Sequence, residues 1–253
     1  MIMKKNFLPI IALALSATAC VSDADLDVAD NKGYINVSVS ADNSMETRAS
    51  STVSNTESWI KKVDDTDWNA SAGYAAGPHK VSVSNYASEI DALNASEGWG
   101  DMFFKGETTV TVEQGKTATA TVDCGRAKNA RLKVAFGTFP NTFSDIKLIA
   151  TTTNSSRQKQ SFEFNSTTSQ LAYFSANESI SYALSWSINN NEKQTSGTIV
   201  LASAATENVI TINPNSNGLI EITISADLEF TNGTKETITI DAATGDKVAN
   251  SQE

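Results

Sequence analysis

The sequence contains only two cysteines and one histidine among its 253 residues. If Cys20 carries a lipid, as argued below, only Cys124 remains, which excludes an internal disulfide framework and any multi-cysteine metal site. The histidine, His79, stands alone after Gly77 and Pro78, and the sequence has neither a nucleophile-elbow motif nor a glycine-rich phosphate loop. We therefore predict that the protein is not an enzyme, has no catalytic residues and requires no cofactor.

Positive charge is also scarce, because 19 basic residues face 29 acidic ones and give a formal net charge of −10. This balance argues against nucleic acid as a partner. The densest acids are Asp64, Asp65 and Asp67, which could bind calcium but lack the glycine and the distal glutamate of a calcium loop. We predict a solvated loop at these positions and no metal site.

No apolar run reaches the roughly 20 residues that a membrane-spanning helix needs. The apolar segment 7–15 is short, follows Lys4 and Lys5, and leads through small residues to Ala19 and Cys20. This order is typical of a bacterial lipoprotein signal, although a spanning helix and an ordinary secretory signal are alternatives. We predict a signal peptide over 1–19, cleavage between Ala19 and Cys20, and lipidation (palmitate) of Cys20.

Residues 20–33 are acidic and cannot pack, so they are expected to form a flexible tether. Ser22, Asp23 and Asp25 resemble the export signal that sends lipoproteins of one group of Gram-negative bacteria to the outer face of the outer membrane. A tether whose charge only keeps it solvated is the alternative. The expected location is the outer membrane, lipid-anchored and facing the cell exterior.

Alternation with a period of two dominates the rest of the chain, as half-buried antiparallel strands require. In segment 34–127 it appears at Ile35 and Val37 and again at Val81 and Val83. A turn at Gly115 is expected to join strands 108–113 and 117–124 as a hairpin, with Cys124 in the core. We predict an N-terminal β-sandwich over 34–127.

Segment 128–242 has a cleaner alternation, with its longest strand over 180–188. Asn232-Gly233, between two alternating strands, is a strong hairpin signal because both turn residues need positive φ. About seven short strands separated by turn residues indicate a Greek-key sandwich. The predicted fold is all-β, with two tandem Greek-key sandwiches of transthyretin or immunoglobulin type and a tail over 243–253.

Several motifs occur in an order that resembles a family of bacterial surface lipoproteins, the domain of unknown function 4493. These are a Val-x-Val strand, an aromatic-rich loop, a Gln-Gly-Lys turn, a strand that ends in cysteine, and a final Gly-Thr-x-Glu-Thr-Ile strand: 79–84, 97–107, 110–117, 121–124 and 233–240. The resemblance implies a sandwich fold similar to that of fimbrillins, the pilus subunits of the same bacteria. It also implies a non-enzymatic structural or adhesive module at the cell surface.

The Thr47-Arg48-Ala49 segment is similar to a sequence near the first strand of fimbrillin-like lipoproteins. In pilus subunits, cleavage after such an arginine removes a strand and opens a groove that a neighbour's strand fills. The resemblance implies proteolytic processing at Arg48 and self-assembly by strand addition; an ordinary arginine in a polar loop is the alternative.

Tryptophan side chains offer a second candidate function. Trp59, Trp68 and Trp99 lie outside the clear strands, and sugars stack on such rings. They indicate a glycan-binding accessory lipoprotein of a polysaccharide uptake system, with Trp99, which is flanked by glycines, expected to be exposed. The alternative is that these rings cover a sandwich edge as part of the core.

Overall fold

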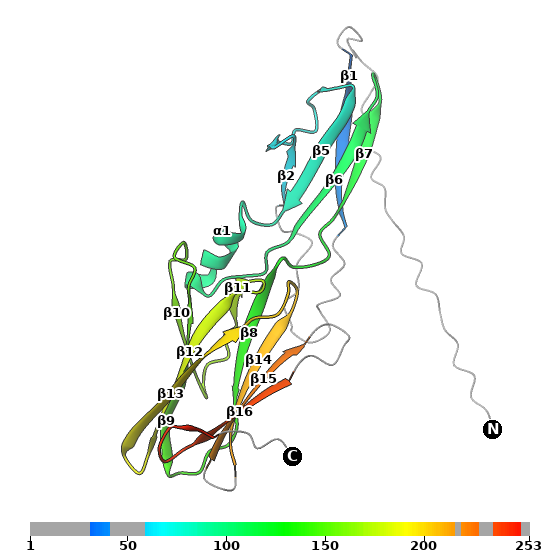
Figure 1. The fold of residues 1–253 in the computed structure, drawn as a ribbon. Coiled ribbons are helices and arrows are strands. Elements are labelled where there is room, and N and C mark those ends of the chain that lie inside the picture. Colours follow the sequence, from blue (N-terminus) through cyan, green and yellow to red (C-terminus); the bar gives the residue numbers. More distant parts are fainter. Residues whose placement is uncertain (1–30, 41–58, 216–218, 228–234, 249–253) are drawn as a thin grey trace, which may run out of the picture.

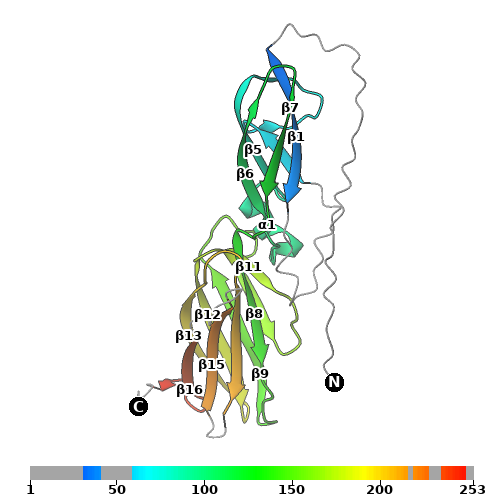
Figure 2. The same ribbon diagram turned by 90° about the vertical axis from the view of Figure 1, so that its right-hand side faces the viewer.

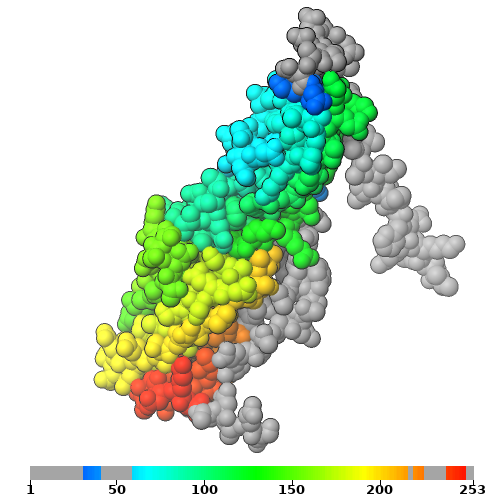
Figure 3. Space-filling view, turned by 45° about the horizontal axis from the view of Figure 1, so that its top comes forward, coloured from blue at the N-terminus to red at the C-terminus, as the bar shows by residue number. Residues whose placement is uncertain are grey.

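The computed structural model describes residues 31–40, 59–215, 219–227 and 235–248. These residues form two β-sandwiches stacked end to end, with one short helix at the junction (Figure 1), and a view turned by 90° shows the same stacking (Figure 2). The space-filling view shows both as one elongated body (Figure 3). The prediction of an all-β chain built from sandwiches is confirmed.

The elements follow the alternation closely in most of the chain. They are β1 (Lys32–Ser40), β2 (Ile60–Val63), β3 (Thr66–Asp67), β4 (Tyr74–Ala75), β5 (Gly77–Ser84), α1 (Glu89–Asn94), a 3₁₀ turn (Ser96–Gly98), β6 (Lys105–Val112), β7 (Thr117–Asp123), β8 (Asn129–Phe136), β9 (Phe143–Thr152), β10 (Ser161–Asn165), β11 (Ala172–Ser175), β12 (Ser179–Ile188), β13 (Asn191–Val200), β14 (Glu207–Pro214), β15 (Leu219–Asp227), β16 (Lys235–Asp241) and β17 (Lys247–Val248).

The N-terminal sandwich packs a sheet of order β4-β1-β7 against a sheet of order β3-β2-β5-β6. Alternate residues of each strand point inward, as the period of two requires, and they include Ile35, Val37, Val81, Val83 and Val122, all at most 4% exposed. These residues form one core cluster.

The predicted hairpin at Gly115 is wrong in one respect. β6 and β7 flank the turn, but β6 pairs with β5 and β7 pairs in parallel with β1. The chain therefore crosses from one sheet to the other at Gly115, which has a φ of 69°. The reason is that β6 and β7 lie in opposite sheets of the sandwich. Alternation shows which side chains of a strand are buried, but it does not show which sheet the strand joins.

The C-terminal sandwich packs a sheet of order β10-β9-β12-β13 against one of order β11-β8-β14-β15-β16-β17. Its core contains the fully buried rings of Phe162, Phe164, Phe174 and Trp186. β15 and β16 pair antiparallel, as the Asn232-Gly233 signal predicts, although the turn itself lies outside the described residues.

The helix α1 lies at the junction of the two sandwiches (Figure 1). It is capped by Ser88, whose side chain accepts a hydrogen bond from the backbone N–H of Asp91, and it buries Ala92 and Leu93. In the part of the chain that the structure describes, no helix is long and apolar enough to cross a membrane.

Arg157 joins the two sandwiches. It comes from the loop between β9 and β10 and is 3% exposed. Its guanidinium donates to the carbonyl oxygens of Leu93 at 3.0 Å and Gly98 at 2.8 Å, and to that of Tyr173 on β11. The same group lies 4.6 Å from the ring centroid of Phe162. This buried cation fixes the end of α1 and the following turn to the C-terminal sandwich.

Candidate functional site

The candidate site is β1 together with the slot that holds it. This slot is formed by β7 along one edge of β1, and by β4, Lys61 and Trp68 along the other. The residues of the predicted signal and processing sites, Ala19, Cys20, Ser22, Asp23, Asp25 and Arg48, lie outside the described residues. β1 is the described strand between these two groups of positions, so its packing decides what cleavage after Arg48 would do to the fold.

One edge of β1 is bound along its length by β7. The two strands run parallel, with Tyr34 opposite Thr117 and each following pair in register as far as Ser40 and Asp123. At one end, the N–H of Tyr34 donates to the carbonyl of Lys116 at 2.8 Å. At the other end, the N–H of Cys124 donates to the carbonyl of Ser40 at 2.7 Å.

A glycine is required where β1 enters the slot. A Cβ at Gly33 would lie 2.3 Å from the carbonyl oxygen of Glu113 and 2.6 Å from that of Lys116. The turn between β6 and β7 therefore closes directly on the backbone of β1, and the N–H of Gly115 donates to the carbonyl of Lys32 at 2.8 Å. A strand with a side chain at this position does not fit.

The other edge of β1 is only partly covered by a strand. β4 pairs with Lys32 and Gly33 alone. Farther along, the indole Nε1 of Trp68 donates to the carbonyl of Ile35 at 2.9 Å, and Nζ of Lys61 donates to that of Val37 at 3.2 Å. Sequence reasoning missed Lys61, because nothing in the four-residue strand Ile60–Val63 distinguishes it from the neighbouring Lys62.

β1 supplies part of the N-terminal core. Ile35 and Val37 are 2% and 4% exposed, and Val39 packs against the same cluster. Full burial of such a side chain stabilises a fold by about 1.5–3 kcal/mol. Without β1, the slot would expose an apolar floor and the unpaired edge of β7.

The three predicted glycan-binding tryptophans do not form an exposed aromatic surface. Trp59 and Trp68 are half-buried against the N-terminal core. Trp99 is 9% exposed and makes edge-on contacts with Phe162 and Phe164, at centroid distances of 5.4 and 5.3 Å. The expectation that Trp99 is exposed is wrong, because its flanking glycines let the chain turn sharply into the junction. The aromatic residues pack as core, and their positions add no support for the glycan-binding alternative.

His79, which stands alone in the sequence, has two hydrogen-bond partners in the structure. Its Nδ1 lies 2.6 Å from Oδ2 of Asp64 and its Nε2 lies 2.7 Å from the carbonyl of Ala75. Both partners are acceptors, so the protonated imidazolium satisfies both. The Ala75 carbonyl raises the pKa of His79, burial opposes this, and Asp64 raises it further.

Asp64 is held in this arrangement rather than left free as a metal ligand. Its Oδ1 accepts from the backbone N–H of Lys80 at 2.9 Å. The hydrogen bond from His79 lowers the pKa of Asp64 most, against a smaller effect of burial. Among the described residues, no three His, Cys, Asp or Glu side chains come together as a metal site would require.

Cys124 lies in the core, as predicted, and is 1% exposed. Its Sγ lies 3.7 Å from the carbonyl of Val83. Burial, followed by the nearby Asp123 carboxylate, raises the pKa of the Cys124 thiol to about 11. This environment is the opposite of the electropositive, accessible one that a nucleophilic cysteine needs.

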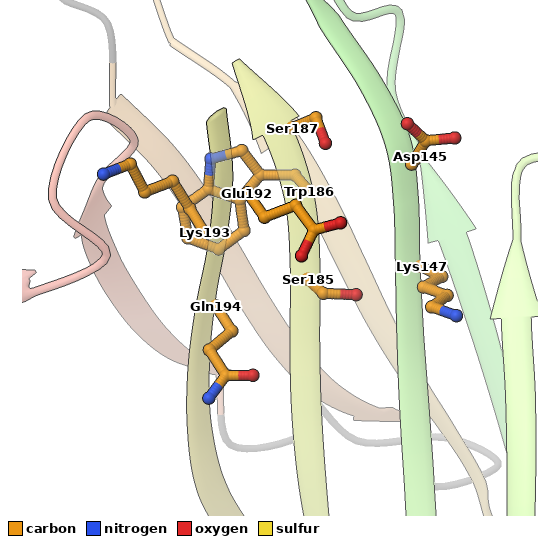
Figure 4. A pocket seen from close by; sticks show the side chains of 8 residues that line it. All are labelled: Asp145, Lys147, Ser185, Trp186, Ser187, Glu192, Lys193 and Gln194. Carbon is orange, nitrogen blue, oxygen red and sulfur yellow. The ribbon is translucent and has the colours of Figure 1, made fainter. Parts of the chain in front are cut away.

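A pocket of about 590 Å³ lies over β9, β12 and β13 in the C-terminal sandwich (Figure 4). Asp145, Lys147, Glu192 and Lys193 are among the residues that line it. Trp186 is also there, but it is 1% exposed and its Nε1 donates to the carbonyl of Ala242 at 2.9 Å. The pocket therefore offers balanced charges without an open aromatic face.

No curated protein matches this chain. A solved structure from Bacteroides ovatus, described as a "putative cell adhesion protein", is 10% identical, with 78% of this chain and 95% of that chain covered and a TM-score of 0.38. Another from Parabacteroides distasonis, described as a "fimbrial assembly protein", is 15% identical, with 65% and 76% covered and a TM-score of 0.39. Both TM-scores are below 0.5.

A family model gives a much broader match than these structures do. The model described as Domain of unknown function (DUF4493) matches residues 10–242, which is most of the chain. The resemblance predicted from the motif order is confirmed, and the chain belongs to this family.

Proposed function

We propose that this protein is a non-enzymatic, fimbrillin-like module of the bacterial cell surface that assembles by strand addition. Cleavage after Arg48 separates β1 from the rest of the chain, and a strand from a second copy takes its place beside β7. The subunits are then joined by main-chain hydrogen bonds and by apolar side chains that enter the neighbour's core.

The packing of β1 is the observation that supports this proposal. β1 lies entirely before Arg48, whereas every other described strand lies after it. It is bound along one edge by β7, and it fills the N-terminal core with Ile35 and Val37. Cleavage therefore removes one complete strand and no other part of the sheets.

Assembly is driven by the unfavourable free energy of leaving the β1 slot empty. Loss of β1 exposes the apolar floor beneath Ile35 and Val37 and leaves β7 without its strand partner in the sheet β4-β1-β7. Such edges bind other strands unless they are covered. A strand from a neighbouring subunit restores both the pairing and the core.

We also propose that Cys20 carries the lipid that anchors the chain to the outer membrane, with Ser22, Asp23 and Asp25 directing it to the outer face. In this scheme the chain is first anchored at Cys20 and then cleaved after Arg48. The cleavage separates the lipid from the part of the chain that assembles. The tethered form is the precursor, and the cleaved form is the polymer subunit.

An unboiled denaturing gel of material shed from the cell surface, with the N-terminus of each band sequenced, tests the proposal. We expect a ladder of bands whose chains begin at Ala49, because strand addition with a buried core resists detergent. A single band beginning at Cys20 would contradict assembly by this route.

The variant Arg48→Ala provides the matched control, since it removes the basic side chain at which the proposed cleavage occurs. It is expected to abolish the ladder while the band that begins at Cys20 accumulates. If Arg48→Ala leaves the ladder unchanged, cleavage at this position is not the trigger.

A further inference from the structure

The two edges of β1 are held by different kinds of contact. Its N–H and C=O groups alternate between the edges, and those of Tyr34 and Ser40 face β7. The carbonyls of Ile35 and Val37 face the opposite edge, where β4 does not reach. There, side chains take the place of a neighbouring strand.

Lys61 and Trp68 are set side by side to make these contacts. The N–H of Trp68 donates to the carbonyl of Lys61 at 2.9 Å, at the end of the β2–β3 hairpin. Nζ of Lys61 lies 4.9 Å from the centroid of the Trp68 ring. Both side chains reach from the sheet that contains β2 to β1 in the opposite sheet, and so they close the side of the sandwich.

Both contacts are made to carbonyl oxygens, which every residue possesses. The outward side chains of β1, at Asn36 and Ser38, are exposed, and neither contact involves them. The contacts therefore do not depend on the sequence of the strand. A cationic donor such as Lys61 also makes a stronger hydrogen bond than a neutral one.

We infer that Lys61 and Trp68 form a backbone clamp, which grips any strand that lies in the β1 slot. The clamp fits one kind of partner, an extended segment of a second copy of this chain that runs parallel to β7. That segment needs glycine at the position of Gly33 and apolar residues two and four positions later. This inference rests on the proposed function, because it assigns the contacts that hold the incoming strand.

The clamp can be tested on the full-length chain after one cut. A recognition site for a sequence-specific protease is placed within 41–58, and cutting leaves β1 bound without a covalent link. A fluorescent peptide with the sequence of residues 32–40 is then added, and its uptake measures the rate at which β1 leaves the slot.

We expect Lys61→Met and Trp68→Phe each to speed the departure of β1 about five- to tenfold, the effect of losing one hydrogen bond of about 1 kcal/mol or slightly more. Lys62→Met is the matched control, since Lys62 is adjacent on β2 and alternation places it on the opposite face. A peptide with Asn36→Ala is expected to enter as fast as the native peptide, because the exposed Asn36 side chain takes no part in either clamp contact. A peptide with Gly33→Ala is expected not to enter.

A second measurement separates the clamp from a general loss of stability. A peptide with a thioamide in place of the Ile35 carbonyl is a poorer acceptor, so it should leave the native protein faster than the ordinary peptide. It should show no such difference on Trp68→Phe, which lacks the donor. Equal thioamide effects on both proteins, or native exchange rates in both clamp variants, would overturn the clamp. The surface ladder is independent of these results, because the cut protein is measured without cells.

Discussion

The backbone N–H of Tyr173 donates to the carbonyl oxygen of Trp99 at 2.8 Å, across the junction between the two sandwiches. The side chain of each residue packs into the core of the other residue's sandwich. Trp99, from the segment after α1, joins the C-terminal core, and Tyr173, from β11, joins the N-terminal core. The two sandwiches therefore share residues at their junction and do not merely touch.

Trp99→Ala should destabilise the fold by about 3–5 kcal/mol, the usual cost of removing a buried tryptophan side chain. Urea unfolding followed by circular dichroism measures this loss. Trp59→Ala is the control, because Trp59 is only half-buried and should cost less. Full stability of Trp99→Ala, together with a loss of retention in a polysaccharide affinity gel, would contradict this prediction and favour the glycan-binding alternative.

Arg157→Met should uncouple the two sandwiches. The variant leaves the carbonyls of Leu93 and Gly98 without their buried donor, which we expect to cost about 2–4 kcal/mol. In calorimetry, the single transition expected for the native chain should separate into two. Arg126→Met, at an exposed arginine, should leave the single transition in place. A native-like melting profile for Arg157→Met would show that this residue does not hold the junction.

The stability contributed by the His79–Asp64 pair should depend on pH. The pKa of His79 is raised from 6.5, so its contribution is complete below pH 6.5 and is lost as the pH rises through the higher folded value. The pKa of Asp64 is lowered from 3.8, so its contribution is complete above pH 3.8 and is lost as the pH falls through the lower folded value. The pair therefore contributes most between these two pH values.

This pH dependence is measured as the difference in unfolding free energy between the native chain and His79→Gln. The difference should shrink between pH 6 and pH 9 and stay below about 1 kcal/mol, because the Asp64 side chain is 54% exposed and solvent screens the pair. A difference that grows with pH would mean that the neutral imidazole is the form that the fold prefers.

Cys124 should resist alkylation in the folded protein. With a pKa of about 11, roughly one thiol in three thousand is ionised at pH 7.5, and burial blocks access to it as well. Mass spectrometry after iodoacetamide treatment should show no adduct in native buffer and complete modification in urea. Rapid labelling of the native chain would require the N-terminal core to open often.

Alternation in the sequence was sufficient to predict most strands and the two-sandwich arrangement. Val81 and Val83 lie inward on β5, and the long strand predicted over 180–188 corresponds to β12. The short helix was missed, although Ser88 and Asp91 have the spacing of a helix cap. Six residues are too few for helical periodicity to show.

The contacts that define the slot and the junction could not be predicted in this way. The parallel pairing of β1 with β7 is decided by which layer each strand enters, and alternation is the same for either layer. Trp68 and Arg157 act through partners 33 and 64 positions away, Ile35 and Leu93. Such pairs depend on the assembled topology, because no local pattern distinguishes these side chains from others of their type.

The pairing of β1 with β7 also has a consequence for the order in which the chain folds. β1 is the first of these strands to be synthesised, yet the partner of Tyr34 is Thr117, 83 positions later. Parallel strands cannot be joined by a tight turn, and contacts between distant positions slow folding. The N-terminal sandwich should therefore complete its folding only after β7 has been synthesised, although its first strand is made 83 positions earlier.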